Sequence, residues 1–390
     1  MAIDQNPCGG LIRFMDSDYL VIGGGIAGAS AAFELAGHGS VVLAERESTL
    51  GYHTTGRSAA MFLENYGEPP VRALAGASRD FLTNPPDGFA SGPILGPRGV
   101  LFLAREDQSA KVEAALAAKR GRPGVIVEVD PARAREMIPV LKPGYLASAL
   151  YEEGASEIDV NTLHQGFQRG LRARGGEIIA DAHVTAIERR GSLWHATTSA
   201  GDMTARVVIN AAGAWADEVA GLAGAAPIGL VPKRRTAFTF DPPAGIDPST
   251  WPMAVDIDEE FYFKVEAGRV LGSPADETPM PPCDVQPEEL DIAIAVDRIQ
   301  RAADVDIRRI THSWAGLRSF VDDHLPVVGC DPQVEGFFWL AGQGGIGIMT
   351  SPAISRIVGA LATGAELPSD IADFGITAAT FAPQRLAKNG

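Results

Sequence analysis

The feature that most constrains the fold is a stretch near the amino terminus, residues 18–45, which reads DYLVIGGGIAGASAAFELAGHGSVVLAE. It begins with a short apolar run, residues 19–22, of the kind that forms a buried parallel strand, and it continues into a helical pattern. A second apolar run ends at Glu45. Between strand and helix stands a Gly-x-Gly-x-x-Gly motif, made by Gly23, Gly25 and Gly28. Strand, glycines, helix, strand and acid in this order predict a dinucleotide-binding βαβ unit.

Each glycine of the motif has its own physical reason. Gly23 permits the tight turn out of the strand, Gly25 lets backbone N–H groups approach a pyrophosphate, and Gly28 lets helix and strand pack closely. The helix N-terminus adds unpaired N–H groups and a partial positive charge. Glu45 stands where an acid can accept hydrogen bonds from a ribose hydroxyl, which disfavours a 2′-phosphate. The predicted ligand is therefore FAD or NAD rather than NADP. A glycine-rich turn without a ligand is the alternative, and it leaves the flanking strands and the acid unexplained.

Length, charge and cysteine usage narrow the class further. A chain of 390 residues is expected to form two or three lobes. Its net charge of −16 argues against nucleic acid or an anionic membrane as a partner. Cys8, Cys283 and Cys330 form no Cys-x-x-Cys pair, so neither a disulfide framework nor a metal site is indicated, and a reduced cytoplasm fits best. The sequence contains no run of about 18 apolar residues, so no membrane span is expected. Residues 1–16 are interpreted as a loose leader.

A second stretch rich in glycine, threonine and serine, residues 51–58 (GYHTTGRS), follows without regular periodicity. We interpret it as an ordered loop across the nucleotide, because its backbone and hydroxyl groups are suited to a phosphate or a flavin. An ordinary helix start with Ser58 as its cap explains the same residues equally well.

Later segments show two kinds of pattern. A buried run, residues 207–209, leads into Asn-Ala-Ala-Gly-Ala-Trp, a small-residue turn that allows another close backbone approach. Residues 229–270 alternate as strands of an antiparallel sheet do. Residues 337–341 form a last buried strand that runs into a glycine turn and a helix. The end of the chain is therefore predicted to return to the nucleotide lobe.

Three of these segments together resemble the D-amino-acid oxidase and glycine oxidase group of FAD-dependent oxidoreductases: GGGIAGASAAFELAGHG, VVINAAGAWAD, and DDHLPVVG with FFWLAGQGGIGIMTSPA. Within this group the chain is most similar to the D-arginine dehydrogenase type, through GYHTTGRSAA, PKRRTAF, EFYFKV, SWAGLRSF and AGQGGIGI. The resemblance implies an α/β fold with a Rossmann-like FAD-binding lobe of the GR2 type. It also implies a second α+β substrate lobe built on a mixed antiparallel sheet, with the active site between the lobes.

The same resemblance sets the expected lobes and cofactor contacts. The FAD lobe would combine three segments and the substrate lobe two: residues 17–60, 150–225 and 320–385, and residues 61–149 and 226–319. FAD is expected to be held without a covalent bond, because no cysteine matches the attachment position before Arg318. The residues predicted to bind FAD are Gly23, Gly25, Ile26, Ala27, Gly28, Glu45, Arg46, Thr54, Thr55, Gly56, Arg57, Ser58, Val184, Ala212, Gly213, Trp215, Gly344, Gly345, Ile346 and Gly347.

The resemblance also implies that Arg235, Arg318, Tyr66 and Tyr262 hold a substrate carboxylate. Two guanidinium groups can fork onto one carboxylate and fix its plane, which a lysine cannot do. Each residue has an ordinary structural explanation as well. Arg235 could belong to a solvated basic cluster, Arg318 to a buried ion pair, and the tyrosines to loop or strand packing.

Three positions depart from the arginine enzyme. Where that type has a histidine, an acid and a glutamine, this chain has Met61, Val100 and Met349. Burying a cation against valine and methionine without a partner is costly. With Gln343 completing the pocket, the substrate is predicted to keep an α-carboxylate and an α-amine but to carry a neutral, apolar side chain.

The predicted reaction is oxidation of a D-amino acid to an imino acid by hydride transfer to the flavin, after which water yields a 2-oxo acid and ammonia. No strong base is required, so His53 and His164 are interpreted as structural. One alternative is oxidation of a secondary amine, such as an N-methyl or cyclic amino acid, or of a 2-hydroxy acid. Another is a flavin-binding subunit without a substrate of its own. An electron acceptor, whether a quinone, another carrier or oxygen, is an expected partner.

Overall fold

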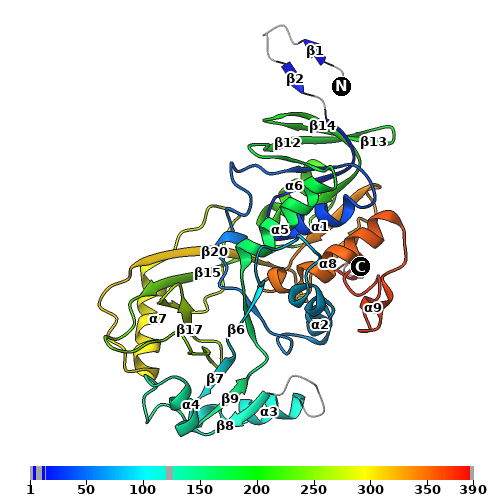
Figure 1. Ribbon diagram of the computed structural model, residues 1–390. Helices are drawn as coiled ribbons and strands as arrows, with labels where there is room; N and C mark the ends of the chain where they lie inside the picture. Colours follow the sequence, from blue (N-terminus) through cyan, green and yellow to red (C-terminus); the bar gives the residue numbers. More distant parts are fainter. Residues whose placement is uncertain (1–2, 6–10, 14, 120–125, 387–390) are drawn as a thin grey trace.

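The computed structural model describes residues 3–5, 11–13, 15–119 and 126–386 and arranges them around two large β-sheets (Figure 1). An eight-stranded sheet lies in the upper part of the view, and a nine-stranded sheet extends toward the lower left. The predicted α/β class, with a Rossmann-like lobe and a second lobe on a mixed sheet, is confirmed. A third, small sheet consists of β5 (Met61–Phe62), β10 (Ser156–Ile158) and β6 (Leu95–Pro97).

The eight-stranded sheet has a parallel centre to which the front, the middle and the end of the chain all contribute. Tyr19 pairs with Val41 on one side and with Val207 on the other. Residues 327–330 then close one edge as the antiparallel strand β21 (Val327–Cys330). The parallel strands are, in spatial order, β11 (Glu177–Ile179), β4 (Val41–Ala44), β3 (Met15–Ile22), β14 (Gly201–Asn210) and β22 (Phe337–Ala341).

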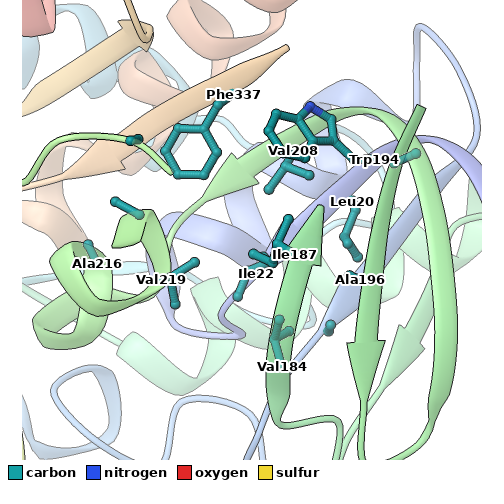
Figure 2. Packing of buried hydrophobic residues seen from close by; sticks show 14 of the residues in the cluster. Leu20, Ile22, Val184, Ile187, Trp194, Ala196, Val208, Ala216, Val219 and Phe337 are labelled. Atoms are coloured by element: carbon teal, nitrogen blue, oxygen red, sulfur yellow. The ribbon is translucent and has the colours of Figure 1, made fainter. Parts of the chain in front are cut away.

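Apolar residues cover both faces of this sheet, because successive side chains of a strand point to opposite sides. Leu20 and Ile22 pack on one face, under two antiparallel strands and a short helix (Figure 2). Tyr19 and Val21 pack on the other face, under long helices. On the first face these elements are α6 (Ala216–Leu222) and the strands β13 (Leu193–Thr198) and β12 (Val184–Arg190), which continue the same sheet from β14. On the second face they are α1 (Ile26–Leu35), α8 (Gly347–Thr363), α5 (Val160–Ala173) and α2 (Pro69–Thr83).

The nine-stranded sheet is antiparallel except where one pair of strands runs parallel, so it is a mixed sheet as predicted. Its apolar face packs against α7 (Glu289–Ala302), whose Ala295 and Ile299 belong to the same hydrophobic cluster as Phe238 and Val270. The strands are β19 (Thr278–Pro279), β15 (Val231–Phe240), β18 (Arg269–Ser273), β17 (Tyr262–Glu266), β16 (Met253–Asp256), β7 (Val100–Ala104), β9 (Ser148–Glu152) and β8 (Ile126–Val129) in spatial order, with β20 (His312–Phe320) on the other side of β15.

Two expected boundaries differ from the structure. β3 begins at Met15, so Met15 and Asp16 of the expected leader belong to the nucleotide sheet, because they pair with Met203 and Thr204 of β14. Upstream, β1 (Ile3–Gln5) pairs with β2 (Leu11–Arg13), and the other residues of the leader lie outside the described part. The predicted division at residue 150 falls inside β9, which belongs to the nine-stranded sheet.

The described part of the chain contains no disulfide bond, no candidate metal site and no helix suited to span a membrane. Cys283 and Cys330 are free thiols, and Cys8 lies outside the described residues. Among residues 15–119 and 126–386, with the two short strands before them, no group of three or more His, Cys, Asp or Glu side chains could hold a metal ion. No described helix combines the length and the apolar character that crossing a membrane requires.

Candidate active site

The glycine turn between β3 and α1 leaves no space for side chains. Gly23 has φ +109°, and a Cβ atom there would lie 2.4 Å from the carbonyl oxygen of Ala211. A Cβ atom on Gly28 would lie 1.8 Å from the carbonyl oxygen of Gly23. Both obstacles are backbone atoms, which cannot move aside as a flexible side chain can. The turn therefore has the close backbone packing that a pyrophosphate-binding βαβ unit needs.

Two side chains tie this turn to its surroundings. Glu45 accepts the N–H of Gly24 at 2.6 Å with one carboxylate oxygen and the N–H of Glu47 at 2.9 Å with the other. Thr55 Oγ1 accepts the N–H of Ile26, the first residue of α1, at 2.9 Å. Each carboxylate oxygen retains a further lone pair. The contact between Glu45 and a ribose stays a prediction.

His164 also holds the glycine turn, through a hydrogen bond to the backbone of Gly24. Its Nε2 donates to the carbonyl of Gly24 at 2.9 Å, and its Nδ1 accepts from Gln168 at 3.2 Å. Burial lowers the pKa of His164 from 6.5, although hydrogen bonds to the carbonyls of Gly24 and Gly25 oppose this. The ring is therefore neutral near pH 7. These contacts agree with the structural interpretation of His164.

Replacing His164 with alanine is expected to lower the free energy of unfolding by about 1–3 kcal/mol, because the buried carbonyl of Gly24 loses its donor. Below about pH 6.5 the unfolded chain binds a proton at this histidine that the folded chain does not. The free energy of unfolding of the wild type therefore decreases as the pH is lowered through this range. The variant should lose that part of the pH dependence. Urea unfolding at pH 5.5 and 7.5 measures both effects, with the exposed His38→Ala as control. Equal stability of H164A and H38A at both pH values would contradict the assignment.

A cavity of about 610 Å³ begins at the glycine turn and extends to the nine-stranded sheet. Most residues predicted to bind FAD line it. Three do not: Gly28 acts in packing, a Cβ atom on Gly56 would lie 2.7 Å from the carbonyl oxygen of Gly51, and Ile346 lines a neighbouring cavity instead. The lining residues among the predicted set are Gly23, Gly25, Ile26, Ala27, Glu45, Arg46, Thr54, Thr55, Arg57, Ser58, Val184, Ala212, Gly213, Trp215, Gly344, Gly345 and Gly347.

The loop of residues 51–58 is an ordered loop, and it contains only a short 3₁₀ turn, Thr55–Arg57. Ser58 follows this turn, so the alternative of a helix start capped by Ser58 is wrong. The Arg57 guanidinium donates to Asp284 at 2.5 Å and to the carbonyls of Val285 and Ala315 at 3.1 and 3.0 Å. We therefore assign the Arg57 side chain to holding the loop against the second lobe rather than to a phosphate.

Aromatic side chains pack against one another near the cofactor half of the cavity; Trp215 was predicted there, whereas the neighbouring Tyr52 was not. His53 lies with its ring centroid 4.7 Å from Trp215, and the Arg46 guanidinium stacks on the same indole at 3.8 Å. His53 Nε2 is 2.9 Å from a carboxylate oxygen of Glu47. These contacts agree with a structural role for His53, although its ring also lines the cavity. In the sequence, only the neighbouring aromatic and polar residues of GYHTTG pointed to such contacts.

The pairing of β15 with β20 brings the two predicted arginines together. Arg235 lies opposite Gly316, and Lys233 lies opposite Arg318. Directly opposed residues share a face, so both arginines project from one face of the sheet, and both line the cavity. Arg234 points to the other face, where it is buried and donates to Glu288 at 2.9 Å and to Asp291 at 2.7 Å. Arg235 therefore does not belong to a solvated basic cluster.

The Arg318 guanidinium makes no hydrogen bond or ion pair with any residue that the structure describes, so the alternative of a buried ion pair is wrong. Burial and the charge of Arg235 lower its pKa, while Tyr262, Tyr66 and Glu277 oppose this shift. A guanidinium remains charged in such surroundings. Gly345 makes room for it, because a Cβ atom there would lie 2.8 Å from Arg318 Nη1. A half-buried cation thus faces the cavity without a counter-ion of its own.

Other predicted substrate residues surround Arg318. Tyr66 and Tyr262 line the cavity, and burial raises the pKa of Tyr66, which therefore keeps its proton at neutral pH. The side-chain amide nitrogen of Gln343 is buried and has no hydrogen-bond partner among the described residues. Met61 and Met349 also line the cavity.

Val100 is placed differently from the prediction. It is fully buried and packs beside Met61 and Tyr262, but it does not line the cavity. Phe102, two positions along β7 and on the same face, lines the cavity in its place. Met253 and Val255 lie beside these two residues, because β16 pairs in register with β7, and both line the cavity. The alternation of β7 was visible in the sequence, but the depth at which the strand meets the cavity was not.

A glycine turn with the close backbone packing that a pyrophosphate needs, and a cavity that runs from it to an unpaired guanidinium, are the features of a dinucleotide-binding protein with a second ligand site. Glu45 beside the turn and a cavity of about 610 Å³ that reaches from the turn to the nine-stranded sheet fit FAD. Residues 18–361 match the family described as DAO, FAD dependent oxidoreductase. The chain belongs to this family, and FAD is its cofactor.

Curated relatives resemble the chain in sequence, and solved structures share its fold, over nearly its whole length. Glycine oxidase of Geobacillus kaustophilus is 25% identical over 372 residues, which cover 92% of this chain and 96% of the relative. Its crystal structure matches with a TM-score of 0.81 at 24% identity, over 92% of this chain and 98% of that chain. L-proline dehydrogenase from P. horikoshii matches with a TM-score of 0.82 at 21% identity, over 96% and 98%. Mitochondrial sarcosine dehydrogenase of Mus musculus is 25% identical over 356 residues, 85% of this chain and 38% of the relative.

Proposed function

We propose that the protein oxidises a D-α-amino acid with a neutral or apolar side chain to the imino acid, which water converts to a 2-oxo acid and ammonia. The two electrons would pass to an acceptor such as a quinone, another carrier or oxygen. The observation that carries this proposal is the Arg318 guanidinium, which lines the cavity with Tyr66 and Tyr262 and has no ion-pair partner among the described residues. A cation in this position needs an anion, and a substrate carboxylate supplies one.

The side-chain end of the proposed substrate is matched to apolar residues. Met61, Met349, Phe102, Met253 and Val255 line this part of the cavity, and an ammonium or guanidinium buried among them would lose its hydration.

Glu259 also lines the cavity, but it is exposed. A cation beside it would stay in water, where such a pair contributes at most about 1 kcal/mol. We therefore expect D-arginine to be a poor substrate.

Each polar residue has a defined part in this proposal. The chemistry that bound FAD supplies is acceptance of a hydride from the substrate α-carbon. Arg318 would bind the carboxylate by a fork of two N–H groups, and the protonated Tyr66 hydroxyl would donate a third hydrogen bond. The side-chain amide of Gln343 offers a further unused donor. Together these contacts would set the orientation of the α-carbon, which is the main contribution that positioning residues make.

A second candidate is oxidation of a secondary amine. Sarcosine dehydrogenase and L-proline dehydrogenase are named for substrates of that kind, and both match this chain over most of its length. Such a substrate would use the same Arg318 contact and would place its N-methyl group or ring among the apolar residues. The carboxylate site alone does not favour one amine class over the other.

Anaerobic reduction of the purified yellow protein tests the proposal. The panel contains D- and L-amino acids, N-methyl and cyclic amino acids, 2-hydroxy acids and D-arginine, and the fading of flavin absorbance is followed. We expect apolar D-amino acids to reduce the flavin quickly and D-arginine slowly, and acid denaturation to release free FAD. Reduction only by secondary amines would establish the second candidate. Efficient reduction by D-arginine at low concentration would refute the apolar pocket, and reduction by no carboxylate at all would refute both candidates.

A further inference from the structure

The two arginines of the substrate site differ in one respect. Arg235 already has a carboxylate partner, because its Nη2 donates to Glu277 at 3.1 Å and its Nε donates to the carbonyl of Asp276 at 2.9 Å. Arg318 has no such partner among the described residues. The other oxygen of Glu277 accepts from Lys233 Nζ at 3.0 Å. The two arginines predicted to hold the substrate carboxylate are therefore not equivalent: Arg318 is unpaired within the described part of the chain, whereas Arg235 already holds the carboxylate of Glu277.

Glu277 lies at the edge of the substrate site. Its side chain is 40% exposed and lines a second cavity of about 620 Å³. This cavity shares Tyr66, Arg318 and Gln343 with the first, so the two cavities meet at the proposed carboxylate site. Negative charge on Glu277 consequently acts on the same cations that a bound carboxylate would use.

Glu277 carries its negative charge at neutral pH. Burial opposes ionisation, but the hydrogen bond from Lys233 and the charges of Lys233, Arg235 and Arg318 lower the pKa of the carboxyl. Three cations thus surround one fixed anion. A ligand with a net negative charge is attracted by the cations and repelled by Glu277, whereas a zwitterionic amino acid has no net charge for this anion to repel.

We propose that Glu277 is a specificity-determining residue that lets the site discriminate against acids with a net negative charge, such as 2-oxo and 2-hydroxy acids, in favour of zwitterionic amino acids. The inference rests on the proposed function, because it assumes that Arg318 binds the substrate carboxylate. A further consequence is weak retention of the 2-oxo acid, which lacks the ammonium group of the substrate. Glu277 also positions Arg235 through the hydrogen bond to Nη2.

The test compares Glu277→Gln with the wild-type holoenzyme. Glutamine removes the charge and keeps one oxygen that can accept from Arg235, whereas its NH2 group cannot accept from Lys233 as the second carboxylate oxygen does. Pyruvate and benzoate are titrated into the oxidised enzyme, and the perturbation of the flavin spectrum gives each Kd. We expect E277Q to lower both Kd values about tenfold, equivalent to about 1.4 kcal/mol. The KM of the best amino acid found in the panel should change less than these two Kd values do, since the zwitterion carries no net charge.

Three controls separate the possible causes. Glu277→Asp keeps the charge and should return the Kd values toward those of the wild type. Asp322→Asn removes an exposed carboxylate of the second cavity that does not contact either arginine, and it should leave them unchanged. Glu277→Ala removes the acceptor as well as the charge, so a rise in the KM of the amino acid would reveal the positioning part of the role.

The outcomes distinguish this inference from the proposed function. Unchanged or higher Kd values for pyruvate and benzoate in E277Q, together with loss of their binding in Arg318→Ala, would overturn the role of Glu277 and leave the carboxylate site intact. Binding of both acids that is unaffected by Arg318→Ala would overturn the carboxylate site itself. Equal tightening in E277Q and Asp322→Asn would show only a general charge effect, which also contradicts the proposal.

Discussion

Replacing Arg318 with alanine is expected to lower kcat/KM for the amino-acid substrate by two to three orders of magnitude while FAD stays bound. Removing one partner of a buried, hydrogen-bonded charge pair costs about 2–5 kcal/mol, and every 1.4 kcal/mol is about tenfold. The loss should be large because Arg318 pairs with no carboxylate among the described residues. Its whole charge is therefore available to the substrate, and the variant loses that interaction completely. Arg235, already bonded to Glu277 and Asp276, cannot replace it.

Anaerobic stopped-flow reduction measures this effect, and the flavin content of each variant reports cofactor binding separately. Arg318→Lys keeps the charge but loses the planar fork, so it should recover only a small part of the activity. Arg308→Ala is the matched control, because that arginine is 85% exposed and, within the part of the chain that the structure describes, pairs only with the nearby Asp306. An R318A enzyme with near wild-type kcat/KM would place the substrate carboxylate elsewhere in the cavity.

Replacing Gly28 with alanine should abolish FAD binding, and we expect the variant to be purified colourless or to be insoluble. The new Cβ atom would lie 1.8 Å from the carbonyl oxygen of Gly23, and that oxygen belongs to the tight turn itself. Relief requires α1 to move away from β3, which would misalign the N–H groups at the start of the helix. A single substitution can lose ligand binding or folding altogether when it places an atom against buried backbone that cannot move away.

The ratio of flavin to protein absorbance and the thermal unfolding of the variant measure this outcome. Gly221→Ala is the matched control: Gly221 is also a helical glycine, in α6, but nothing lies within 4 Å of a Cβ atom there. That variant should keep its FAD and unfold at the same temperature as the wild type or slightly higher, since alanine favours a helix. A yellow, stable G28A protein would show that helix and strand tolerate a wider spacing.

The asymmetry of the two arginines changes how the site selects ligands. A clamp of two free guanidiniums would bind any carboxylate strongly, including the 2-oxo acid that the proposed reaction forms. With Glu277 on Arg235, the principal contact would fall to Arg318, and the fixed negative charge would restrain net anions. Selection between an amino acid and its 2-oxo acid would then depend on the ammonium group rather than on a larger contact surface.

The features that the sequence determined by itself are local. Gly23, Gly25 and Gly28 stand within a few residues of the strand and helix that they join, so their spacing alone specifies the turn. The buried run at residues 337–341 and the glycines after it were recognisable for the same reason. In each case the chemistry depends on backbone conformation over a short stretch, which the order of side chains directly encodes.

The composition of the substrate site was decided by tertiary structure, because it depends on how distant strands pair. Register between β15 and β20 places Arg235 and Arg318 on one face and turns Arg234 away. The depth at which β7 meets the cavity sets Phe102, not Val100, at its wall, although both residues lie on the same face of the strand. The contact of Glu277 with Arg235 joins residues that no motif connects. A one-residue change of register would send each of these side chains to the opposite face, and the local sequence would look the same.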